Sequence, residues 1–100
     1  MATTTKALFR GAAATSSTTL YTVPASTTTV VTNIVVTNSA ASAATFTLTL
    51  NSVDIFTTAA IAANSTAMFD LKQVLTTGQI IAGFASAVTV KFHISGVEIS

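Results

Sequence analysis

Short runs of β-branched and aliphatic residues alternate with polar turns along most of this chain, and this pattern limits the folds that it can adopt. From Thr18 onward the runs recur at a spacing of roughly ten residues, which is typical of antiparallel sandwiches and barrels rather than of βαβ units. We therefore expect an all-β domain: an antiparallel two-sheet sandwich, jelly-roll-like with about eight strands, with a short N-terminal arm.

Alternation of side-chain type assigns residues to the two faces of the expected strands. In segment 45–50 the even-numbered apolar residues are predicted to point inward and three threonines outward. In segment 29–37 the even-numbered face is the more apolar, but Val31 and Val35 lie on the other face, so both faces are expected to be partly covered. The expected strands span residues 18–23, 29–37, 45–50, 53–61, 66–71, 79–84 and 87–95.

Two places interrupt this strand pattern. Residues 72–78 are expected to form a loop with a short turn that closes one end of the sandwich. Near the C-terminus the apolar positions change parity after Ile94, and Gly96 lies at the change. A β-bulge adds one residue to a strand and resets which face points inward, so we expect a bulge at Gly96 and inward-facing Val97 and Ile99.

A chain of 100 residues has room for one domain, which we divide into an arm with a short strand, residues 1–17, and a sandwich, residues 18–100. The arm carries two apolar residues, Leu8 and Phe9, between two cations, Lys6 and Arg10. We predict that these four residues contact a partner, because apolar anchors flanked by cations suit an acidic surface. The alternative is an edge strand that completes the protein's own sheet or trimer.

Tyr21 is a further candidate for contact with a partner. Its parity opposite Leu20 makes it a candidate for a surface contact, but a buried ring with a hydrogen-bonded hydroxyl is the expected arrangement for such a tyrosine.

Charged residues make up only 7% of the chain and hydrophobic residues 50%, with a formal net charge of +1. A soluble domain usually carries charge on about a quarter or more of its surface, whereas threonine protects a sheet only weakly against association. We therefore expect the outer faces to be covered by copies of the chain or by a larger assembly. The charge balance provides no basic field for nucleic acid, and no apolar run approaches the ~18 to 20 residues of a membrane span, so neither is an expected partner.

The side chains that support catalysis are few: one histidine, three carboxylates and no cysteine. His93 is predicted on the polar face of its strand, where a solvent-facing or interface role is the expected one. A serine triad of His93 with Asp54 or Asp70 has no framing motif, and the two aspartates lack the spacing of metal ligands. The sequence therefore predicts no enzyme, no catalytic or metal-binding residue and no cofactor.

Several segments resemble short virion proteins of tailed bacteriophages. They are KALFRG at 6–11, TLYTVPA at 19–25, TTTVVTNIVVTN at 27–38, ATFTLTLN at 44–51 and VTVKFHISGVEIS at 88–100. The resemblance implies a capsid decoration or cement protein, made in the host cytoplasm and located in the virion. It also implies a homo-oligomer, commonly a trimer around a symmetry axis, that binds the major capsid protein or another virion protein and bridges capsid subunits.

Three other classes stay open at this point. A phage tail or baseplate component is the nearest alternative. A carbohydrate-binding or adhesin module would require exposed aromatic residues or a calcium cluster, which the sequence does not indicate. A pilin-like polymer subunit would require a secretion signal or an incomplete sandwich.

Overall fold

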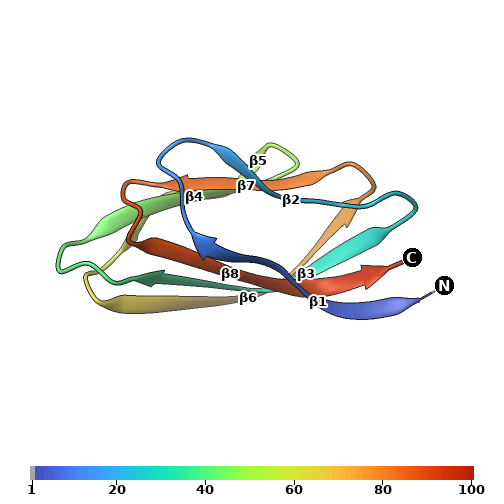
Figure 1. Cartoon of the computed structure of the whole chain (residues 1–100), viewed down its shortest axis with the longest axis horizontal. Helices are drawn as coiled ribbons and strands as arrows, with labels where there is room; N and C mark the ends of the chain where they lie inside the picture. The colour runs from blue at the N-terminus through green and yellow to red at the C-terminus, as the bar shows by residue number, and fades with distance from the viewer. Residues whose placement is uncertain (1) are drawn as a thin grey trace.

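The computed structural model describes residues 2–100, which form eight β-strands in two four-stranded antiparallel sheets (Figure 1). The predicted all-β, two-sheet sandwich is thus confirmed. No helix among the described residues is long and apolar enough to cross a membrane. The strands are β1 (Thr3–Ala12), β2 (Thr18–Thr22), β3 (Thr28–Asn38), β4 (Ala44–Leu50), β5 (Val53–Ile61), β6 (Ser65–Thr76), β7 (Ile80–Ala85) and β8 (Val90–Ile99).

The strand order is that of a long hairpin rolled into two layers. One sheet, here called the first sheet, has the order β1-β8-β3-β6, and the second sheet has the order β2-β7-β4-β5. In such a hairpin the first strand pairs with the last, and each following strand pairs with the one that precedes the last partner. The observed pairs are β1 with β8, β2 with β7, β3 with β6 and β4 with β5. This arrangement is the eight-stranded jelly roll, and it brings both chain ends to one end of the molecule (Figure 1).

The core lies between the sheets and is centred on phenylalanine rings. Phe46 on β4 of the second sheet packs 5.5 Å from Phe56 and 6.1 Å from Phe92, which lies on β8 of the first sheet, between ring centroids. The predicted inward positions of β4 are confirmed, since Phe46, Leu48 and Leu50 are all buried. Aromatic rings from both layers therefore contribute, together with the buried Leu, Ile and Val side chains, to the apolar burial that holds the sheets together.

Bulges in β1, β2 and β3 decide which residues reach this core. Each adds one residue, at Leu8, Leu20 and Thr32, opposite a continuous neighbouring strand. The bulge at Thr32 explains why Val31 and Ile34, three residues apart, are both fully buried. The even-numbered face predicted to be inward in β3 is therefore inward only after the bulge, at Ile34 and Val36, whereas Thr29 and Val31 are the buried residues before it.

The predicted bulge at Gly96 is wrong, because β8 keeps its alternation through this residue and the neighbouring strands carry the bulges instead. Gly96 occupies a tight inward position. A Cβ built there would lie 2.9 Å from Leu8 Cδ1 and closer still to the carbonyl oxygen of Val30. Consequently Glu98 points between the sheets, while Val97 and Ile99 point outward rather than into the core.

Two other boundaries differ from those predicted. The segment 72–78 is not a loop, because β6 continues to Thr76 and keeps pairing with β3 through Leu75, which is buried opposite Thr29. Strand β8 begins only at Val90, and Val88, predicted inward, is 61% exposed.

The N-terminal segment was predicted as an arm with a short strand. It contains the ten-residue strand β1, which pairs with β8 from Thr3 opposite Ile99 to Ala12 opposite Lys91. In this structure the segment is an edge strand of the protein's own first sheet, which is the alternative considered from the sequence.

Candidate interaction surface

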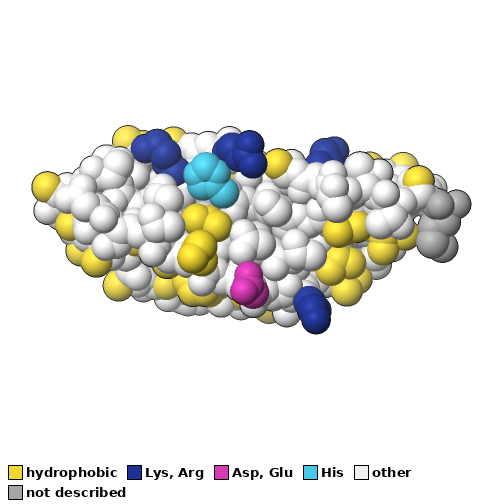
Figure 2. Space-filling view, turned by 90° about the horizontal axis from the view of Figure 1, so that it is seen from below, with side chains coloured by type: hydrophobic (Ala, Val, Ile, Leu, Met, Phe, Trp, Pro, Cys, Tyr) yellow, Lys and Arg dark blue, Asp and Glu magenta, His cyan; other side chains and the backbone are white. Residues whose placement is uncertain are grey.

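The outer face of the first sheet is the broad surface seen in Figure 2. Pairing places the outward residues of β1, β8, β3 and β6 in rows that run across the four strands. One row joins Val97, Val30 and Val74, and Val74 is 62% exposed. A second row ends in Met68, which is 74% exposed. Aliphatic side chains therefore occupy positions at which a free-standing sheet usually carries charge.

The second row also contains basic residues. It reads Arg10, His93, Val35 and Met68 across β1, β8, β3 and β6. Lys91 lies two residues from His93 on the same face of β8, and its Nζ is 3.4 Å from Ser39 Oγ. Figure 2 shows the histidine beside basic side chains along one long margin of the face. We call Arg10, Lys91 and His93 the cationic corner.

The four contact residues predicted in the N-terminal segment do not act as one group. Leu8 is only 7% exposed and belongs to the core, and Phe9 is half-buried against it. The bulge at Leu8 lets both consecutive side chains turn inward. Lys6 lies 3.5 Å from Glu98, and only Arg10 stands exposed on the outer face. The two apolar anchors are thus occupied within the sandwich in this structure.

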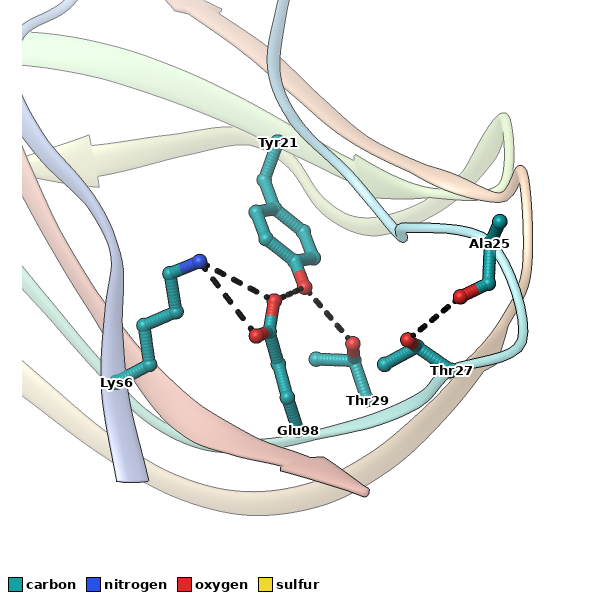
Figure 3. Close-up of polar contacts among 6 residues, drawn as sticks. All are labelled: Lys6, Tyr21, Ala25, Thr27, Thr29 and Glu98. Carbon is teal, nitrogen blue, oxygen red and sulfur yellow. Dashed lines mark hydrogen bonds and ion pairs between the residues drawn. The ribbon is translucent and has the colours of Figure 1, made fainter. Parts of the chain in front are cut away.

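Tyr21 lies between the sheets with its hydroxyl hydrogen-bonded, and not at the candidate surface position, because the bulge at Leu20 changes the parity of β2 (Figure 3). Its hydroxyl donates a hydrogen bond to Glu98 on β8 of the opposite sheet. Thr29 Oγ1 lies 2.9 Å from the same hydroxyl, and Lys6 approaches the carboxylate from β1. Burial and the hydrogen bond to Glu98 raise the pKa of Tyr21 above 10.0. This polar group joins the two sheets.

The residues considered for catalysis or metal binding are separated. Asp70 accepts a hydrogen bond from Asn33 Nδ2 at 3.1 Å, and Asp54 accepts one from Thr57 Oγ1 at 2.9 Å. His93 lies opposite Arg10 on another part of the surface. Within residues 2–100, no three His, Cys, Asp or Glu residues are grouped so that they could hold a metal ion. An open hollow of about 400 Å³ at the Thr32 bulge is lined by Thr32, Asp70, Leu71 and Lys72.

Two placements, one on the outer face and one between the sheets, were not predicted from the sequence. The cationic corner joins residues from β1 and β8, at opposite ends of the chain, so only the strand pairing brings Arg10 beside His93. The inward position of Glu98 would have followed from simple alternation, had Gly96 not been interpreted as a bulge.

No protein-family model matches this chain, and neither a curated protein nor a solved structure shows significant similarity to it.

Proposed function

We propose that this protein is a structural virion protein of a tailed phage, which decorates or cements the outer capsid shell and bridges neighbouring capsid subunits. The observation that carries the proposal is the aliphatic character of the outer face of the first sheet, with Val97, Val30 and Val74 in one row and Met68 in the next. Such a face suits a protein whose outer surface is permanently covered by neighbouring subunits.

The chemistry of the chain is consistent with a structural role. The carboxylates of Asp54, Asp70 and Glu98 each have a hydrogen-bond partner within the fold, and none of them adjoins His93 in the strand pairing. We assign the protein no catalytic activity and no cofactor, and neither nucleic acid nor a membrane is part of the proposed assembly.

A jelly roll provides the rigidity that cementing requires, because both sheets are tied together by a continuous core. We propose self-association, as a trimer at symmetry axes of the shell, in addition to contact with the major capsid protein. Many copies on one shell make each contact sufficient even when it is weak, because neighbouring contacts raise the effective concentration.

Sedimentation with purified particles tests this function. Particles produced by the genes encoded beside this one, without the gene itself, are mixed with the purified protein and separated into heads and tails. The proposal predicts saturable binding to heads at many copies per shell. Binding to tails alone would replace it with the tail alternative, and binding to neither would contradict a virion role.

A further inference from the structure

The outer face of the first sheet holds an unequal distribution of charge. The chain has only four Lys and Arg residues, and Arg10 and Lys91 stand together on the β1–β8 side of this face, with His93 in the row of Arg10. Arg10 is directly opposite His93. Within residues 2–100, the Lys6–Glu98 pair is the sole ion pair, so Arg10 and Lys91 have no carboxylate partner there.

The nearest acidic residue on the face does not neutralise this corner. Asp70 lies on β6, three strand spacings, about 14 Å, from Arg10 on β1. It is also four residues, about 13 Å, along β6 from Thr66, which lies in the row of Lys91. Exposed charges that far apart are largely screened at physiological salt, where the Debye length is about 8 Å. Asp70 is also engaged with Asn33. The positive charge of the corner is therefore uncompensated within the molecule.

Such a grouping does not help the isolated sheet. Lys91 is two residues from His93, the residue opposite Arg10, so Arg10 and Lys91 are diagonal neighbours on paired strands. Long side chains of like charge reach one another at such positions and repel. The grouping is explained when a partner supplies the missing negative charge.

The apolar residues next to the cationic corner indicate what kind of surface the partner presents. Val35 and Met68 continue the row of Arg10 and His93 toward the other margin of the sheet, and Met68 is 74% exposed. Arginine and methionine are both enriched where proteins bind proteins, and methionine adapts its shape to an irregular surface. A phosphate backbone would require more cations along a track and would leave the aliphatic half of the row without a role.

We propose that the cationic corner and the adjoining Val35 and Met68 bind a surface of the major capsid protein on which carboxylates stand beside aliphatic side chains. This inference rests on the proposed function and names the contact through which it operates. Arg10 and Lys91 pair with the carboxylates, His93 donates a hydrogen bond to one of them, and Met68 packs on the aliphatic part.

Charge reversal tests the inference, with shells assembled from the major capsid protein as the probe. Arg10→Glu and Lys91→Glu are each expected to weaken shell binding roughly tenfold, and to reduce its dependence on salt. Lys72→Glu is the matched control, because it makes the same change in charge on β6, away from the corner, and should bind within about twofold of the wild type. Circular dichroism and thermal melting establish that all three variants fold.

The outcomes separate the inference from the function. If the wild type binds shells and Arg10→Glu and Lys91→Glu bind equally well, the inference is overturned and the proposed function stands. The same conclusion follows if Lys72→Glu weakens binding as much as the other two variants do. No binding of the wild type to shells would overturn both. Tighter binding of the wild type to a duplex DNA oligonucleotide than to shells, lost in the same variants, would assign the corner to nucleic acid and overturn the inference.

Discussion

The Tyr21 hydroxyl donates a hydrogen bond to Glu98 across the two sheets of the jelly roll (Figure 3). Tyr21 comes from β2, near the start of the second sheet, and Glu98 from β8, near the end of the chain. The side chain of Glu98 is only 15% exposed, and Lys6 and Tyr21 both contact its carboxylate. This contact fixes the end of the sandwich at which both termini lie.

Removal of the tyrosine hydroxyl should weaken this end of the fold. Tyr21→Phe leaves a partly buried carboxylate and Thr29 without one of their partners, so we expect the free energy of unfolding to fall by about 1–2 kcal/mol. Urea denaturation followed by circular dichroism measures the change. Asp54→Asn is the control, since this exposed carboxylate is hydrogen-bonded to the neighbouring Thr57, and it should change stability by less than about 0.5 kcal/mol. Equal stability of Tyr21→Phe and wild type would show that the contact between the sheets contributes nothing.

The same residue makes stability depend on alkaline pH. Burial and the hydrogen bond to Glu98 raise the pKa of Tyr21 in the folded state above its ordinary 10.0, so the folded state holds the phenolic proton more tightly than the unfolded state. The resulting stabilisation is complete below pH 10 and is lost as pH rises through the folded-state pKa. Tyr21 is the only tyrosine and the chain has no tryptophan, so tyrosinate absorbance reports this titration directly. A native-state midpoint at or below that of the urea-unfolded chain would contradict the assignment.

Gly96 should not accept a side chain. Its added Cβ would meet Leu8 and the backbone of Val30, and backbone atoms cannot move aside easily, so Gly96→Ala is expected to lower stability by about 1–3 kcal/mol. Gly11→Ala on β1 provides the comparison, because there the nearest atom, Phe9 Cζ, lies at an ordinary 3.5 Å. Similar denaturation midpoints for the two variants would contradict the tight packing of β8 between β1 and β3.

Leu8 distinguishes a core strand from a docking arm. Because Leu8 is buried at the β1 bulge, Leu8→Ala should reduce the free energy of unfolding by about 2–3 kcal/mol, near the lower end for buried leucines. Chemical denaturation measures this loss. Unchanged stability together with reduced shell binding would instead support the exposed arm predicted from the sequence.

The sequence predicted the sandwich and the apolar interior of β4 well, because period-two alternation is a local signal and β4 keeps a continuous register with β7 from Phe46 to Leu50. Thr47, predicted outward, is nevertheless buried. The bulges at Leu8, Leu20 and Thr32 carry no glycine or other local mark. They depend on pairing with strands distant in sequence, and each changes which side chains face the core.

The role of Gly96 also depends on residues that are distant in the sequence. A glycine in a strand signals either a bulge or a close approach of another chain segment, and the choice depends on what packs against it. Here Leu8 and Val30 from two neighbouring strands occupy the space. The strand order and the meeting of Arg10 with His93 likewise follow from non-local pairing.

Electron microscopy of phage particles with and without this protein tests the central claim most directly. Both kinds of particle are produced from the same neighbouring genes. The reconstruction of the particle without the protein is then subtracted from that of the particle with it. A decoration protein should give difference density on the outside of the shell, repeated at equivalent lattice positions, into which the 46 × 21 × 18 Å jelly roll fits. Identical heads in the two reconstructions would contradict the claim.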